Sequence, residues 1–130
     1  MQHPRVGIAS DGVALGLDHD LNRPHPRSIG TFPRAMRELL DDGMGIEEIV
    51  WKMTGKAARR LGLVDRGRIE VGAVADLVLF DPDRVHDRAT YADPLVVPAG
   101  IERVWVGGQV IAEDGHITGR LPGGLLRRQR

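Results

Sequence analysis

The spacing of apolar residues changes at Gly62, and this change limits the possible folds of the chain more than any other feature of the sequence. Up to Gly62, apolar residues recur every three to four residues, which is typical of amphipathic helices. After Gly62 they form short unbroken or alternating runs, which are typical of strands. The sequence therefore predicts a first part, residues 1–62, that contains the helices, and a second part, residues 63–130, that is all β.

Three helices are predicted in the first part, over residues 31–43, 45–53 and 55–61. Thr31 is the expected cap of the first helix, with Pro33 in its first turn and Gly43 at its end. Thr54 is expected to cap the third helix and Gly62 to end it. The side chains expected to face the core are Phe32, Met36, Leu39, Leu40, Ile46, Ile49, Val50, Met53, Ala57, Ala58 and Leu61.

Glycines and other turn residues separate the predicted strands of the second part. Residues 75–81 (ADLVLFD) carry an unbroken apolar run, as in a strand covered on both faces. The pair Gly107-Gly108 lies between residues 101–106 and 109–114, and a two-residue glycine loop between apolar runs is a strong signal for a β-hairpin. Shorter strands are expected at residues 69–71 and around Ile117.

One strand-like run stands apart at the start of the chain. Residues 5–10 (RVGIAS) are predicted to form a buried strand that ends at the turn pair Asp11-Gly12, and residues 16–30 to form a polar loop. A single strand of this kind followed by helices cannot complete a sheet, because it needs neighbours on both edges. The first third of the chain is therefore expected to be the end of a larger unit.

Composition argues against several classes of function. Lys+Arg and Asp+Glu are both 18, and the formal net charge of +0 argues against nucleic acid or an anionic membrane as the main partner. No run approaches the ~20 apolar residues of a membrane-spanning helix. With Cys 0, the chain has no disulfide and no thiolate metal site. We expect a cytoplasmic protein whose partner is a small molecule or another protein.

Three motifs are specific enough to indicate a family. IASDG at residues 8–12, HPRSIGTFPR at 25–34 and DRGRIEVGAVADLVLFDP at 65–82 resemble the C-terminal portion of the N-acyl-D-amino-acid deacylases (D-aminoacylases), which are metal-dependent amidohydrolases. That family has a (β/α)8 barrel, which alone takes about 250 residues, and a small β-sandwich. The resemblance implies an α+β fragment, in which residues 1–62 supply the last strand and closing helices of the barrel, and residues 63–130 supply part of the β-sandwich.

The resemblance also implies roles for three residues. Asp11 matches the family's general acid/base, which moves the proton in amide hydrolysis and in some members is also a weak metal ligand. Arg27 matches the position that binds the α-carboxylate of the substrate, where a guanidinium makes a planar bidentate contact. His25 lies beside it as a second substrate-binding residue. Without the motifs, Asp11-Gly12 is explained by a turn, and His25 and Arg27 by a solvated loop.

The same resemblance implies zinc as the cofactor of the full-length enzyme, where it activates the attacking water. The family's metal ligands are an N-terminal H-x-H pair, a Cys or a carboxylated Lys, and two further His residues, and the five His residues of this chain do not show that spacing. No complete metal site is therefore expected in this chain, and the pair His19-Asp20 is assigned to a surface loop. We expect the chain to be inactive without the missing barrel or a partner copy.

Two other functions fit the sequence less specifically. A cyclic amidohydrolase, such as a dihydroorotase or hydantoinase, shares the ADLVLFD motif, although the GTFPR segment argues against it. A noncatalytic β-sandwich module would bind a partner, or self-associate, through the apolar surface left by the missing barrel. The leading interpretation is a hydrolase that cleaves the linear amide of N-acyl-D-amino acids to a carboxylate and a free D-amino acid.

Overall fold

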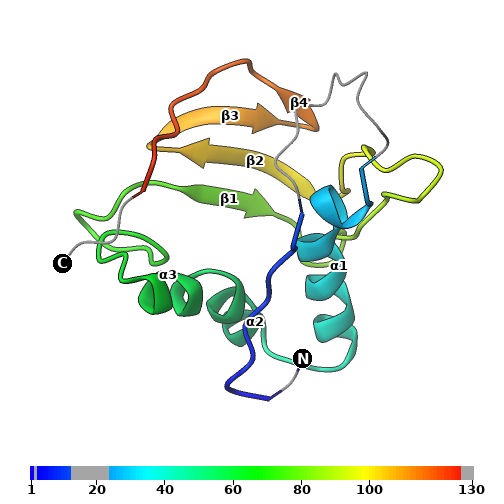
Figure 1. Cartoon of the computed structure of the whole chain (residues 1–130), viewed down its shortest axis with the longest axis horizontal. Coiled ribbons are helices and arrows are strands. Elements are labelled where there is room, and N and C mark those ends of the chain that lie inside the picture. The colour runs from blue at the N-terminus through cyan, green and yellow to red at the C-terminus, as the bar shows by residue number, and fades with distance from the viewer. Residues whose placement is uncertain (2, 13–23, 127–130) are drawn as a thin grey trace.

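The computed structural model describes residues 1, 3–12 and 24–126 of the 130-residue chain. Within these residues, three helices precede a four-stranded antiparallel sheet (Figure 1). The helices are α1 (Arg27–Asp41), α2 (Ile46–Met53) and α3 (Gly55–Leu61). The strands are β1 (Leu77–Phe80), β2 (Ile101–Val106), β3 (Gln109–Glu113) and β4 (His116–Ile117). None of the described helices is long and apolar enough to cross a membrane.

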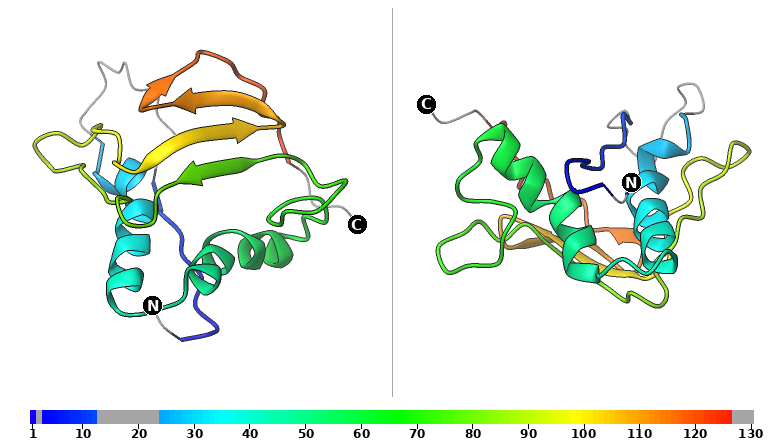
Figure 2. Two further views of the ribbon diagram at one scale, coloured as in Figure 1. Left: turned by 180° about the vertical axis from the view of Figure 1, so that it is seen from behind. Right: turned by 90° about the horizontal axis from the view of Figure 1, so that it is seen from below.

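The helices lie on one side of the sheet, and the N-terminal segment, residues 3–12, runs between α1 and the α2–α3 pair (Figure 2). The strands are ordered β1-β2-β3-β4, so β1 and β4 are the edges of the sheet. The loops around the sheet contact the helices. For example, Arg37 Nη1 on α1 donates to the Pro82 carbonyl, which follows β1, at 3.0 Å. A Cβ on Gly67 would lie 2.7 Å from the Cβ of Ala58, so this loop packs directly on α3. The architecture is α+β, and the sheet follows the helices along the chain.

Helix α1 begins four residues before the predicted start at Thr31. It starts at Arg27, because the Pro26 carbonyl accepts the N–H of Gly30 at 2.9 Å and so closes the first turn. The prediction that Thr31 caps this helix is therefore wrong, and its hydroxyl donates to the Arg27 carbonyl at 2.8 Å from inside the helix. Pro33 also lies inside α1 rather than in its first turn.

The ends of the helices and the bounds of α2 and α3 are confirmed. Gly43 and Gly62 have φ of 82° and 75°, in the left-handed region that commonly ends a helix. Thr54 lies between α2 and α3, but its hydroxyl donates back to the Val50 carbonyl at 2.7 Å instead of capping α3.

The helical core is smaller than predicted. Leu39 and Ile49 are fully buried, at 0% exposure, and Ala58 is buried beside them. Three side chains expected in the core are exposed, because no described element packs on that side of their helices: Phe32, Ala57 and Leu61.

The hairpin of β2 and β3 is confirmed. Gly107 and Gly108 have φ of 55° and 78°, and a type I′ hairpin turn requires positive φ at both central residues. The N–H of Gly107 donates to Asp76 Oδ1 at 2.8 Å, which ties the turn to the residue before β1. A second turn, at Asp114 and Gly115, leads into β4.

Two expectations for the sheet are wrong. Residues 69–71 form no strand, and Ile69 is 92% exposed, because no described strand lies beside them. The β1 side chains of Val78 and Leu79 are 53% and 47% exposed rather than covered on both faces. Strand β1 is an edge strand that pairs only with β2 among the described strands, so its environment is more open than an unbroken apolar run suggests.

The buried strand predicted at residues 5–10 is also wrong. Arg5 lies in a turn, in which the N–H of Val6 donates to the His3 carbonyl at 3.0 Å, and residues 6–10 pair with no described strand. Val6 is 41% exposed. The segment lies against α2, where the N–H of Ile8 donates to the Lys52 carbonyl at 3.4 Å. Lys52 is only 1% exposed, and its Nζ donates to the carbonyls of His3 at 2.8 Å and Val6 at 3.4 Å. The buried lysine thus supplies a donor to the Val6 carbonyl, which has no strand partner among the described residues, and a second donor to the His3 carbonyl.

Candidate active site

The N-terminal segment and the start of α1 bring Asp11 and Arg27 together. Oδ2 of Asp11 lies 3.1 Å from Nη2 of Arg27, and the two side chains are 88% and 45% exposed. An exposed ion pair contributes little to stability. The pairing is therefore of interest as an arrangement of a proton-moving group and an anion-binding group, rather than as a stabilising contact.

Gly12 explains how Asp11 comes so close to α1. A Cβ at residue 12 would lie 2.7 Å from the Cα of Ser28 in the first turn of the helix, so only glycine permits this approach. The N–H of Gly12 donates to Ser10 Oγ at 3.1 Å, and Asp11 itself has φ of 48°. The positive φ of Asp11 and the bond from Gly12 to Ser10 set the local backbone from which the carboxylate reaches Arg27.

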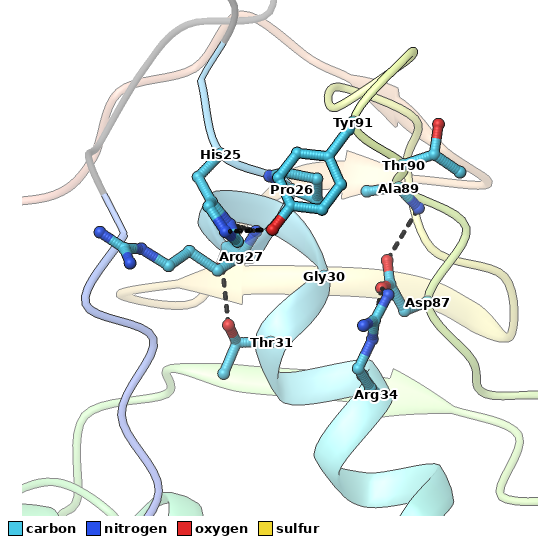
Figure 3. Close-up of a pocket in the computed structure, with 10 residues that line it drawn as sticks. All are labelled: His25, Pro26, Arg27, Gly30, Thr31, Arg34, Asp87, Ala89, Thr90 and Tyr91. Atoms are coloured by element: carbon cyan, nitrogen blue, oxygen red, sulfur yellow. Dashed lines mark hydrogen bonds and ion pairs between the residues drawn. The ribbon is translucent and has the colours of Figure 1, made fainter.

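His25 lies beside Arg27 in sequence, but its ring points towards Tyr91, while the Arg27 side chain points away from Tyr91 (Figure 3). The Nδ1 atom of His25 accepts the backbone N–H of Arg27 at 3.0 Å, and Nε2 lies 2.9 Å from the Tyr91 hydroxyl oxygen. The two rings pack edge to face, with centroids 5.0 Å apart and an interplanar angle of 76°. Both ring nitrogens of His25 are thus bonded within the protein.

A cavity of about 370 Å³ lies between the start of α1 and the loop that carries Tyr91. Two arginines contribute to its lining: Arg27 and Arg34. The sequence motifs indicated the helix side of this cavity, at residues 25–34, but not the opposite side, at residues 87–91.

Asp87 is the residue of this site that sequence reasoning missed most clearly. Its side chain is 5% exposed, and its Oδ2 accepts from Nε and Nη2 of Arg34 at 2.9 and 2.6 Å. Its Oδ1 accepts the N–H of Ala89 at 2.8 Å. A Cβ on Gly30 would lie 2.2 Å from Oδ1, so glycine on α1 makes the space for the carboxylate. We call the set of Gly30, Arg34, Asp87 and Ala89 the Asp87 joint.

The described residues do not by themselves fit a zinc ion. Protein zinc sites use three or four His, Cys or carboxylate ligands, and no three such side chains come together within residues 1, 3–12 and 24–126. Asp11, the candidate weak ligand, faces a guanidinium instead of a second ligand. The pair His19-Asp20 lies outside the described residues.

Comparison with known proteins identifies the class of protein. Residues 4–112 match the model of the amidohydrolase family, and the chain belongs to that family. The chain is 46% identical over 124 residues to a D-aminoacylase of Alcaligenes xylosoxydans xylosoxydans, covering 93% of this chain and 24% of that protein. It is 43% identical over 129 residues to an N-acyl-D-glutamate deacylase of the same organism, covering 98% and 25%.

The fold comparison agrees with the sequence relatives. The crystal structure of N-acyl-D-glutamate deacylase from Bordetella bronchiseptica, complexed with zinc and a phosphonate inhibitor, matches with a TM-score of 0.78 at 39% identity. The match covers 92% of this chain and 24% of that one. The resemblance to the deacylases is confirmed, and the chain spans about a quarter of the length of these relatives.

Proposed function

We propose that this chain acts as the C-terminal portion of a zinc-dependent hydrolase that cleaves N-acyl-D-amino acids to a carboxylate and a free D-amino acid. In this proposal residues 1–62 close the catalytic barrel, and residues 63–130 belong to the adjoining β-sandwich. The deacylase relatives, which cover 93% and 98% of this chain, support the reaction type. The zinc-bound deacylase structure supports the choice of metal.

The contact of 3.1 Å between Asp11 and Arg27 carries the assignment of roles. Arg27 binds the α-carboxylate of the substrate, because a guanidinium presents parallel N–H donors to a carboxylate. The α-carboxylate and the amide nitrogen are attached to the same carbon, so binding at Arg27 brings the scissile amide next to Asp11. As a carboxylate, Asp11 takes a proton from the attacking water and then delivers it to the leaving amine.

The decisive experiment places this chain in the context of a whole enzyme. A chimera in which this chain replaces the matching quarter of the Alcaligenes D-aminoacylase should hydrolyse N-acetyl-D-amino acids when loaded with zinc. Asp11→Asn should lower kcat by about a hundredfold or more, the usual range for a general acid/base. Arg27→Lys should raise KM on the order of tenfold, because one charged hydrogen bond is lost.

Asp114 supplies a matched control, because it also precedes a glycine, is exposed and has φ of 48°. Asp114→Asn should leave kcat unchanged. An Asp11→Asn chimera that keeps full kcat would refute the role of Asp11. Turnover by the isolated 130-residue chain with added zinc would refute the need for the rest of the barrel.

A further inference from the structure

The start of α1 is capped by His25 rather than by its N-cap residue. The first N–H groups of a helix have no partner within it, and Pro26, at the N-cap, makes no side-chain cap hydrogen bond. His25 accepts two of these groups, the N–H of Arg27 at Nδ1 and the N–H of Ser28 at its carbonyl, both at 3.0 Å. The backbone N–H of Arg27, the first residue of α1, is therefore held by His25.

This cap determines the tautomer of the ring. A backbone N–H can only donate, so Nδ1 of His25 is the acceptor and the ring proton lies on Nε2, which donates to the Tyr91 oxygen at 2.9 Å. His86 and His116 are opposite cases, because their Nδ1 atoms face the carbonyls of Arg84 at 2.8 Å and Asp114 at 3.0 Å and must donate. His86 and His116 thus serve as internal references for the opposite tautomer.

Tyr91 lies on a loop that is held at both ends. On one side, the Asp87 carboxylate accepts the N–H of Ala89, which is 4% exposed. On the other, Thr90 exchanges two hydrogen bonds with Asp93, each at 3.0 Å. Tyr91 itself is 76% exposed, so the hydrogen bonds at the two ends of the loop, rather than burial, hold its hydroxyl against the His25 ring.

We propose that Tyr91 and His25 form a positioning pair that orients Arg27 towards Asp11; its consequence for catalysis rests on the proposed function. Tyr91 fixes the His25 ring, and His25 fixes the Arg27 N–H. The Thr31 hydroxyl holds the Arg27 carbonyl at 2.8 Å from the other side. The guanidinium therefore extends from a residue whose backbone N–H and carbonyl are both bonded. This lowers the backbone entropy that is lost when Arg27 binds a carboxylate.

Tyr91→Phe in the full chain tests the pair without any assay of activity. This variant keeps the aromatic ring and removes only the hydroxyl. In hydrogen-exchange NMR, the Arg27 amide should exchange about fivefold faster, the effect of one ordinary hydrogen bond. The Nε2 proton of His25 should exchange faster as well, while the Nδ1 protons of His86 and His116 stay unchanged. Unchanged exchange at Arg27 would overturn the proposal.

Two further variants separate positioning from general loosening. Thr118→Val removes a hydroxyl that donates to the Val110 carbonyl at 3.0 Å in the sheet, and it should leave the Arg27 amide unchanged. His25→Asn keeps a side-chain acceptor for the residue 27 amide but loses the contact with Tyr91. In that background Tyr91→Phe should have no further effect. An equal effect of Tyr91→Phe with and without His25 would overturn the proposal, as would an equal effect of Thr118→Val.

The chimera then links the pair to the reaction. Tyr91→Phe should raise KM for N-acetyl-D-amino acids about fivefold and leave kcat within about twofold, because Arg27 would bind ground and transition states equally. A loss of kcat without a change in KM would overturn the role in orienting Arg27. If the unsubstituted chimera shows no hydrolysis while the exchange results hold, the proposed function fails and the positioning pair stands.

Discussion

The N-terminal segment, residues 3–12, and the β2–β3 hairpin satisfy their backbone hydrogen-bonding groups in different ways. The two strands of the hairpin pair with each other across a two-residue turn, so their backbone hydrogen bonds form within residues 101–113. The segment instead uses the side chains of Lys52 and Lys56 and the carbonyl of Lys52. The hairpin is therefore stabilised locally, whereas the segment that carries Asp11 depends on the helices.

The largest expected effect comes from Gly30→Ala in α1, which tests whether the helices can be destabilised without the hairpin. In a helix this change ordinarily stabilises by about 1 kcal/mol. Here the new Cβ would lie within 2.5 Å of all three carboxylate atoms of Asp87. We expect a net destabilisation of about 2 to 3 kcal/mol in urea unfolding, and exchange at hairpin amides should change less than exchange in α1.

A second substitution supplies the control for Gly30→Ala. In an Asp87→Ala background the carboxylate is gone, so Gly30→Ala should become neutral or stabilising. A destabilisation of equal size in both backgrounds would show that the clash with Asp87 is not its cause.

Lys52→Met should have the next largest effect, confined to the N-terminal segment. Methionine fills most of the buried space but cannot donate to the carbonyls of His3 and Val6. Losing charged hydrogen bonds should lower the free energy of opening this segment by about 2 kcal/mol. Hydrogen exchange at the Ile8 amide measures this loss. Arg60→Met, on an exposed position of α3, is the control, and equal exchange in both variants would contradict the clamping role of Lys52.

Gly108→Ala should weaken the hairpin by about 1 kcal/mol. The φ of 78° costs an L-residue roughly this much, and the nearest atom to the new Cβ is 4.0 Å away, so no clash adds to it. Thermal unfolding measures the change, and exchange at Ile8 should stay as it is. A larger loss at Ile8 than in the hairpin would show that the two regions are coupled.

The smallest expected effect is that of Glu113→Gln. Glu113 lies opposite Arg103 across the hairpin and forms an ion pair with it. Both side chains are more than 40% exposed, so the pair should contribute about 0.5 kcal/mol. The difference in unfolding free energy between the unsubstituted chain and Glu113→Gln should be smaller still in 1 M NaCl, since salt screens exposed charges. A loss above 1 kcal/mol that salt does not reduce would contradict a solvent-exposed pair.

Local signals account for the parts of the fold that the sequence predicted. Two helix ends, at Gly43 and Gly62, and one hairpin turn, at Gly107-Gly108, form from residues that are adjacent in the sequence. The start of α1 was misplaced at Thr31 because the cap at residue 25 uses a ring nitrogen, which no common capping pattern includes. The strand at residues 5–10 was predicted from apolar character alone, without a partner strand in the described chain.

The site was predictable only on its motif-bearing side. Asp11, His25 and Arg27 were selected by resemblance, and the structure places Asp11 beside Arg27. The residues that contact this side lie far along the chain. Asp87 is 53 positions after its partner Arg34, and Tyr91 is 66 positions after its partner His25. No pattern of local spacing connects such distant residues, so their contribution required the fold.

The Asp87 joint also sets a rule for recombining this sequence with its relatives. One buried carboxylate is shared by a helix and a loop, and glycine at residue 30 is the condition for its fit. A crossover point between residues 34 and 87 would inherit the helix from one parent and the carboxylate from the other. Crossovers before residue 30 or after residue 89 keep the four residues of the Asp87 joint from one parent. Libraries built with these crossovers should contain a larger share of folded variants than libraries with crossovers between residues 34 and 87.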